Sequence, residues 1–340
     1  MKWELLLNNM KILFFYQYMP NYNFDHPLHT SLIAYMSKIE GIEVKCYGYR
    51  MEEILPLLCV YPYNAGITME QLYQKFPFDA VILMTKSRMF LNYLPKYAMG
   101  NTRGEIKEGF WLPRDFCSFN KSIKTVLEED AHYEADDSWY KELGIKFVLQ
   151  RHYVNVEFMN SFNSGVKHIF FPFSVDTNLF RDTGQPRQNL ITYVGSVNNM
   201  YYVDRTKAVA VLKEVRMITQ DSPKRKEDQE YVKDLNSFVS HLSGQSAYYI
   251  LPAKIYEIAA SGSLLFTSAN PKTGMDLVFP PDTYVKFEDD CSDIISKASF
   301  ILTERDQVKE IVSRARKHVL ENHTHEIRTK QLVEILNDNK

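Results

Sequence analysis

The sequence predicts an α/β protein with two domains, each a doubly wound parallel sheet, and three observations predict it. Short apolar runs recur along the chain, as expected of strands that are buried on both faces. Stretches with apolar residues at helical spacing separate these runs, and this alternation is typical of βαβ units. The alternation restarts after Pro172–Asn189, a segment with two prolines, a glycine and several polar residues that is typical of a linker.

The first Rossmann-like domain is predicted over residues 10–172. Its first strand is the aromatic run Lys11–Tyr16, followed by a helix whose apolar positions run from Leu28 to Met36. The alternating segment Ile42–Tyr47 is the second strand, so strand, helix and strand follow one another within about 40 residues. Further strands are predicted at residues 78–84, 123–127, 145–149 and 166–171.

The second Rossmann-like domain is predicted over residues 186–322. The C-terminal helix, taken as residues 326–340, is expected to pack on the first domain. The charged stretch Asp221–Asp234 is predicted to form a solvated loop and helix face. Ligands of open parallel sheets bind where the strands end, so we expect a site in a cleft between two facing domains. The predicted strands are residues 190–194 and 263–267, and the predicted helices are 205–218, 252–260, 304–321 and 326–336.

Composition excludes several classes of protein. With 45% hydrophobic and 24% charged residues, the 340-residue chain can bury a core and is not disordered. Its 40 Lys+Arg against 42 Asp+Glu argue against a surface devoted to nucleic acid, although a local basic groove stays open. The four cysteines form no C-x-x-C pair, which argues against a zinc site or a disulfide scaffold and favours the cytoplasm. No apolar run reaches the roughly 18 residues of a membrane span, so no transmembrane segment is expected.

The first candidate site follows the strand at residues 190–194. Gly195 has no Cβ, so a phosphate could approach its backbone, and amides at the start of the next helix would meet negative charge. Arg205 and Lys207 at the start of that helix could neutralise a diphosphate. The alternative is a tight turn followed by two exposed cations.

The second candidate site is the short helix at residues 252–260. Lys254 and Glu257 are three residues apart and therefore share one face of this helix. They could form a surface ion pair worth a few tenths of a kcal/mol. Alternatively, the carboxylate accepts hydrogen bonds from two ribose hydroxyls while the lysine meets a phosphate. The spacing leaves both interpretations open.

Four segments of the C-terminal half together carry a resemblance to a known family. The run 171–180 is similar to an interdomain P-x-x-V-D-x-x-x-F stretch, and 191–196 is similar to a strand and glycine that open a donor domain. The run 254–267 is similar to R-x-x-E-x-x-A-x-G-x-x-x-x-T, and 322–328 to N-H-T-x-x-x-R. On these segments the chain resembles nucleotide-sugar glycosyltransferases of the GT-B type, in the group 1 and spore-maturation-like branch. The N-terminal half agrees only in its alternation of strands and helices.

The resemblance implies a nucleotide diphosphate sugar, such as a UDP-sugar, bound to the C-terminal domain. Glu257 would hold the ribose, and the diphosphate would be surrounded by Gly195, Ser196, Arg205 and Lys254. The resemblance implies no cofactor and no bound metal, because positive side chains and helix N-termini stabilise the departing diphosphate. No Asp-x-Asp triplet occurs in the sequence, in agreement with metal independence.

Catalytic candidates follow the strand at residues 123–127. His132 resembles the histidine that faces the donor sugar in many such enzymes, and Asp130 could be a base or bind the acceptor hydroxyl. The alternative is a solvated acidic cluster at the end of a strand. On the acceptor side, the candidates are Asp25, His26 and His29. By contrast, His323 and His325 are expected to cap and pack the last helix.

Two departures from the family pattern leave the donor sugar and the stereochemical course open. Tyr249 stands eight residues before Glu257, at the position of a second acid in many relatives. The glycine-rich loop usual after the first strand is replaced by Tyr16–Asn23, whose tyrosines could stack on a sugar or a base.

The leading functional hypothesis is a hexosyltransferase that moves a sugar to an acceptor hydroxyl of a glycan or glycoconjugate. A variant of this hypothesis makes the acceptor a hydroxymethylated base in DNA, contacted by a loosely basic stretch. A third hypothesis is a non-catalytic nucleotide or sugar binder, and a fourth is a sugar-nucleotide epimerase. The basic stretch comprises Lys86, Arg88, Lys96, Arg103 and Arg114.

Overall fold

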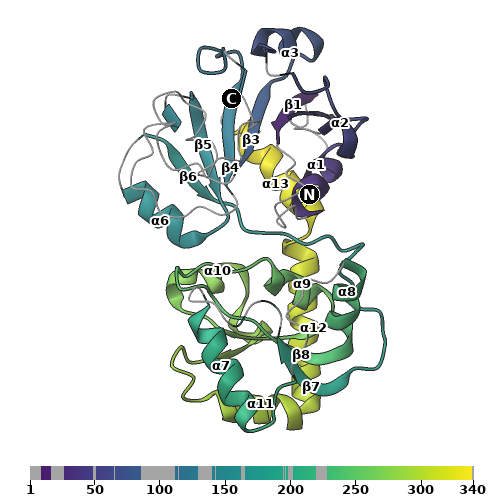
Figure 1. The fold of residues 1–340 in the computed structure, drawn as a ribbon, viewed down its shortest axis with the longest axis vertical. Coiled ribbons are helices and arrows are strands. Elements are labelled where there is room, and N and C mark those ends of the chain that lie inside the picture. The colour runs from purple at the N-terminus through teal and green to yellow at the C-terminus, as the bar shows by residue number, and fades with distance from the viewer. Residues whose placement is uncertain are drawn as a thin grey trace. The chain divides into compact units, whose positions relative to one another are not determined.

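The structure is a computed structural model, and the chain divides into two compact units (Figure 1). The first unit comprises Met1–Arg151, Asn155–Phe171 and Thr329–Lys340, and the second comprises His152–Val154 and Pro172–Arg328. The structure describes residues 9–16, 27–48, 51–64, 66–85, 112–113, 115–128, 140–141, 143–161, 165–193, 195, 197, 202–219 and 228–338.

The first unit contains a parallel sheet of six strands in the order β2-β1-β3-β4-β5-β6. Each strand lies within two residues of its predicted position, because apolar runs of this length are distinctive of strands covered on both faces. The strands are β1 (Met10–Phe15), β2 (Ile42–Tyr47), β3 (Ala80–Thr85), β4 (Ile123–Glu128), β5 (Ile145–Gln150) and β6 (Lys167–Phe170).

Alternate side chains of this sheet enter two separate cores. Leu13 and Phe15 of β1 belong to one core, and Ile12 and Phe14 belong to the other. Successive residues of a strand point to opposite faces, so β1 contributes to both cores. The first unit also includes helices α1 (Pro27–Met36), α2 (Met51–Ile54) and α3 (Met69–Lys75), and α6 (Tyr153–Ser161) follows β5.

The C-terminal helix, α13 (His325–Asn337), contributes to the second of these cores. Leu332, Val333 and Leu336 are buried beside residues of β1 and β2. Their spacing of i, i+1 and i+4 places them on one side of the helix. The C-terminal helix α13 and the first strand β1 therefore belong to the same core.

The second unit contains a parallel sheet of four strands in the order β10-β9-β8-β7. Helices α7 and α11 pack on each other, as do α9 and α12, and both pairs contact the sheet. The strands are β7 (Gln188–Tyr193), β8 (Phe238–Leu242), β9 (Leu264–Ser268) and β10 (Val285–Phe287). The helices are α7 (Val203–Glu214), α8 (Asp228–Ser237), α9 (Lys254–Ala260), α10 (Met275–Val278), α11 (Ile294–Thr303) and α12 (Arg305–Asn322).

Strand β8 is absent from the predicted elements, and its polar residues explain why. Ser240 and His241 lie in its middle and are buried. The Ser240 hydroxyl donates to the Leu264 carbonyl at 3.2 Å, and His241 Nδ1 lies 2.7 Å from Ser263 Oγ. Buried polar groups are tolerated when they are hydrogen-bonded, so these tertiary contacts allow a strand that lacks an apolar pattern.

None of the described helices is both long enough and apolar enough to cross a membrane. The four cysteines, which all lie in described segments, are free thiols.

Replacing Leu332 with Ala should destabilise the first unit. The Leu332 side chain is fully buried, and truncating such a leucine removes packing and leaves a cavity, at a cost of about 3 kcal/mol. Chemical denaturation followed by circular dichroism measures the change. Glu334→Ala on the exposed side of the same helix is the control and should cost less than about 0.5 kcal/mol. Equal stability of the two variants would show that α13 is not part of this core.

Candidate functional site

The candidate site centres on Gly195, two residues beyond the carboxyl end of β7. Its φ of +101° lies in a region that favours glycine. A Cβ at this position would lie 2.5 Å from Lys254 Nζ and 2.6 Å from Arg205 Nη1. Both distances are far below van der Waals contact, so the ends of the two cationic side chains would have to shift if residue 195 carried a Cβ.

Arg205 reaches this space from the first turn of α7. The residue is only 1% exposed, and its guanidinium carbon lies 4.3 Å from the centroid of the Tyr202 ring. Its Nη2 donates to the carbonyl of Gly244, which follows β8, at 3.4 Å. Burial lowers the pKa of Arg205, but a guanidinium remains charged at neutral pH. The stacking and the hydrogen bond fix the direction of a permanent positive charge.

Lys254 is the first residue of α9, and its side chain is partly exposed. Burial, followed by repulsion from Arg205, lowers the pKa of the Lys254 ammonium to about 8, and attraction by Glu257 opposes both effects. The ammonium is therefore mostly protonated at neutral pH. Two positive charges converge at one glycine, and an anion placed between them would relieve their repulsion.

Glu257 lies one helical turn further along α9 and is 2% exposed. The hydroxyl of Tyr231 in α8 donates to Glu257 Oε2 at 2.7 Å. Burial and the adjacent carboxylate raise the pKa of Tyr231 well above its ordinary value, so this hydroxyl remains a donor. The surface ion-pair interpretation of Lys254 and Glu257 is wrong, because the carboxylate is inside the fold and is oriented by a tyrosine.

A hydrogen-bond network fixes the loops at this edge of the sheet. Gln245 Nε2 donates to Asp204 Oδ2 at 3.0 Å, and the backbone N–H of Asn270 donates to Gln245 Oε1 at 2.9 Å. Asn270 Nδ2 donates to Asp289 Oδ2 at 2.9 Å. These residues follow β8, β9 and β10 or belong to the first turn of α7, so the network joins three strand ends to the helix that carries Arg205. Lys207 instead donates to the Asp290 carbonyl at 2.6 Å.

Tyr249, which stands at the position of the second acid, has a φ of +58°. This left-handed conformation is costly for a bulky residue. The preceding turn is held by the Ser246 hydroxyl, which accepts from the amides of Tyr248 and Ile250 at 3.2 Å each. The ammonium of Lys272 lies 5.0 Å from the centroid of the Tyr249 ring. An aromatic ring beside a cation thus stands eight residues before Glu257.

Five of the predicted site residues lie outside the described residues: Asp25, His26, Asp130, His132 and Ser196. The same is true of the basic stretch from Lys86 to Arg114. His29 falls in α1, where its side chain is not described. The structure brings together the other four predicted site residues, Gly195, Arg205, Lys254 and Glu257, around one position.

Sequence reasoning missed Tyr231. It falls in the charged stretch that was predicted to be solvated, but α8 places its hydroxyl on Glu257. The available signal was the helical spacing of Tyr231 and Leu235, the second of which is fully buried. Few apolar residues among many charges still define a buried face.

His323 and His325, which were expected to cap and pack the last helix, contact Val278, Phe279 and Ser174 of the second unit. His323 Nε2 lies 2.8 Å from the Val278 carbonyl, and its ring stacks on Phe279. Burial, followed by the charge of Arg328, lowers the pKa of His323 to about 3, so the ring is neutral. His325 Nδ1 lies 2.8 Å from Ser174 Oγ.

No group of three or more His, Cys, Asp or Glu side chains in the described ranges is placed to hold a metal ion.

Most residues of this site lie in a segment that matches a known family. Residues 202–334 match the model of a family described as glycosyl transferase-like. This match contains Arg205, Lys254, Glu257 and Tyr231. No curated protein matches the sequence.

Solved structures match over nearly the whole chain. A glycosyltransferase from Rickettsia africae is 13% identical with a TM-score of 0.65, covering 97% of this chain and 98% of its own. Sucrose-phosphate synthase from Thermosynechococcus elongatus is 10% identical with a TM-score of 0.61, at 97% and 98% coverage. HepE from Anabaena, in complex with UDP and glucose, is 11% identical with a TM-score of 0.60, at 97% and 100% coverage. These likenesses confirm the predicted fold of two Rossmann-like domains, the GT-B architecture.

Lys254 should titrate near pH 8 and should react with acetic anhydride at lower pH than an exposed lysine. At pH 8 it is about half deprotonated, whereas an ordinary lysine is less than about 1% deprotonated. Arg205→Gln removes a repulsion and should raise the pKa, and Glu257→Gln removes an attraction and should lower it. Competitive labelling with mass spectrometry measures both, with exposed Lys317 as the internal reference. Identical labelling profiles of Lys254 and Lys317 would contradict the electrostatics described above.

Proposed function

We propose that this chain, which has the GT-B fold, is a glycosyltransferase that moves a sugar from a nucleotide diphosphate sugar to an acceptor hydroxyl. The observation that carries this proposal is the convergence of Arg205 and Lys254 at Gly195, one helical turn from the buried carboxylate of Glu257. Two cations suit a diphosphate, and a carboxylate suits the two hydroxyls of a ribose.

The diphosphate is proposed to bind at Gly195. Charge-assisted hydrogen bonds from a guanidinium and an ammonium to phosphate are short and strong. During transfer, the bond between the sugar carbon and the diphosphate oxygen breaks, and negative charge grows on the leaving oxygen. Arg205 and Lys254 would stabilise this charge in the transition state more than in the ground state, which is the condition for catalysis. We therefore propose that no metal ion is required for departure of the diphosphate.

The ribose is proposed to bind Glu257. Each oxygen of an ionised carboxylate can accept more than one hydrogen bond, so Tyr231 can orient the group while ribose hydroxyls donate to it. UDP is the nucleotide in the HepE complex, which shares the fold of this chain. On this ground we propose a UDP-sugar as the donor. The neighbouring apolar residues of α9 are fully buried, and their packing holds Glu257 in place.

The acceptor is proposed to be a hydroxyl of a glycan or glycoconjugate. Its oxygen forms the new bond to the sugar carbon and loses its proton to a base. Asp130 is the proposed base and His132 the proposed hydrogen-bond partner of the sugar. Both residues follow the carboxyl end of β4 closely in the sequence, and ligands of parallel sheets bind at such ends. Asp25, His26 and His29 are the acceptor-side candidates, located between β1 and α1 or in α1.

Glu257→Ala should weaken UDP binding by about 1–3 kcal/mol, the range for losing charged hydrogen bonds. Tyr231→Phe keeps the ring and removes only the donor, so it should weaken binding by about 0.5–1.5 kcal/mol. Isothermal titration calorimetry with UDP measures both. Glu230→Gln, an exposed neighbour in α8, is the matched control and should bind UDP as the parent does. A folded Glu257→Ala protein with unchanged UDP affinity would refute the ribose assignment.

His132→Ala should lower turnover of the UDP-sugar about tenfold, corresponding to the loss of one hydrogen bond of roughly 1.4 kcal/mol. Asp130→Asn should cost more, about a hundredfold or above, because it removes a base. Both variants should bind UDP with parental affinity, since neither residue is assigned to the nucleotide. Donor consumption with acceptor present gives the turnover. A His132→Ala protein that fails to fold would instead indicate a histidine of the core.

A further inference from the structure

A cavity lies at the N-terminal ends of the strands of the four-stranded sheet. The candidate site described above lies at their carboxyl ends. Arg187 directly precedes β7, Val239 is the second residue of β8, and Gly262 precedes β9 by two residues. The cavity has a volume of about 580 Å³, within the range of small-molecule sites. Gly195 lies beyond the other end of β7, so this cavity is separate from the proposed donor site.

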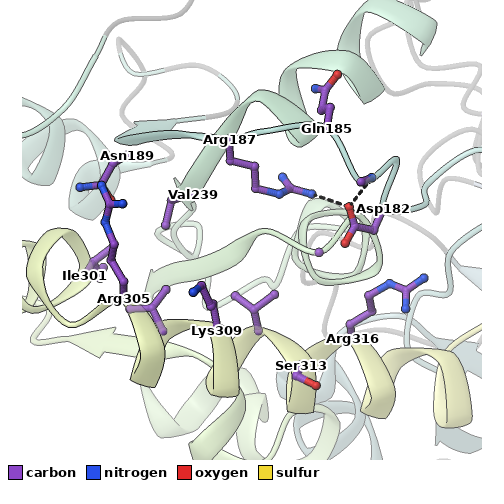
Figure 2. A pocket seen from close by; sticks show the side chains of 14 residues that line it. Asp182, Gln185, Arg187, Asn189, Val239, Ile301, Arg305, Lys309, Ser313 and Arg316 are labelled. Carbon is purple, nitrogen blue, oxygen red and sulfur yellow. Dashed lines mark hydrogen bonds and ion pairs between the residues drawn. The ribbon is translucent and has the colours of Figure 1, made fainter.

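One face of α12 forms a wall of the cavity (Figure 2). Arg305, Lys309 and Arg316 lie at i, i+4 and i+11, which places them on the same side of the helix. The apolar part of the lining is formed by aliphatic side chains from β8, α11 and α12. These are Val239, Ile301, Val308 and Val312.

Arg187 faces this helix from the segment before β7 and is already fixed by the protein. It donates to the Leu235 carbonyl at 2.7 Å and to Asn236 Oδ1 at 3.0 Å. It also pairs with Asp182, with 3.2 Å between Nη2 and Oδ1. Asp182 is the sole acid among the described residues that line the cavity. Its ion pair with Arg187 balances its negative charge.

The three cations of α12 therefore have no acid of the cavity lining to balance them. Arg305 and Lys309 repel each other at i, i+4 spacing. Lys309 pairs with Asp306 at 3.1 Å, but the two side chains are 76% and 94% exposed, so this pair contributes little. Arg316 Nε is buried and has no hydrogen-bond partner within the described part of the chain. Leaving a buried charged donor unpaired is costly unless a ligand satisfies it.

We propose that this cavity binds a phosphorylated small molecule with an apolar portion. Guanidinium groups match phosphate oxygens in a bidentate geometry, and Arg305 and Arg316 supply two of them on either side of Lys309. The aliphatic part of the lining accommodates the apolar portion. The ligand is not the donor substrate of the proposed function, because its site is at the other edge of the sheet.

The test uses 1-naphthyl phosphate, inorganic phosphate and neutral 1-naphthol as probes at constant ionic strength, with affinity measured by calorimetry. The parent protein should bind 1-naphthyl phosphate at least tenfold more tightly than either of the other probes. The double variant Arg305→Gln/Arg316→Gln should bind it at least tenfold more weakly than the parent. Lys317→Gln, an exposed change on the same helix, should leave the affinity unchanged.

Two further variants make the result decisive. Arg305→Gln alone, at an exposed position, should weaken binding at least threefold if the double variant does not fold. Lys254→Gln should leave binding of 1-naphthyl phosphate unchanged, and the double variant should bind UDP as the parent does. The proposal is overturned if the parent does not bind the probe, if 1-naphthol binds equally well, if the α12 variants match Lys317→Gln, or if Lys254→Gln abolishes binding.

Discussion

The arrangement of the candidate site depends on the missing side chain at Gly195. A single methyl group there would lie within about 2.6 Å of both Arg205 and Lys254. Placing two cations so close together is unfavourable, and burial adds to the cost because charges lose hydration. The protein tolerates this cost at a position where the strand ends and the loop turns. Such stored repulsion is typical of sites that bind an anion, since the ligand then recovers the energy.

The carboxylate of Glu257 illustrates how a rigid neighbourhood serves the same site. The short helix α9 is buried along most of its length, so the acid cannot turn toward solvent. Tyr231 supplies a neutral donor instead of a second cation, which orients the carboxylate without neutralising it. The hydroxyl of Tyr231 therefore fixes the direction of the acid, and attraction by Glu257 opposes the lowering of the Lys254 pKa.

Much of the fold follows from the sequence, because strands buried on both faces require continuous apolar runs such as those of β1 and β3. In the first unit, β2 and β6 lack such a run, since β2 alternates and β6 begins with Lys167 and His168. The second unit departs from the rule where tertiary contacts replace hydrophobicity, as at Ser240 and His241 in β8. Of the candidate site, the sequence predicted Gly195, Lys254 and Glu257, which belong to motifs of fixed spacing, and Arg205, which begins the predicted helix after Gly195. Tyr231 belongs to none, and only the packing of α8 brings it to the acid.

Two arginines of the second unit show why burial alone does not mark a binding residue. Burial lowers the pKa of both Arg187 and Arg205. Arg187 has a paired acid, an amide oxygen and a backbone carbonyl as acceptors, so the protein itself accounts for its charge. Arg205 also donates to a backbone carbonyl, that of Gly244, but its guanidinium lies against a tyrosine ring and beside a second cation at a glycine. The neighbouring cation, rather than burial, distinguishes Arg205 from Arg187, because an anion placed between two cations would relieve their repulsion.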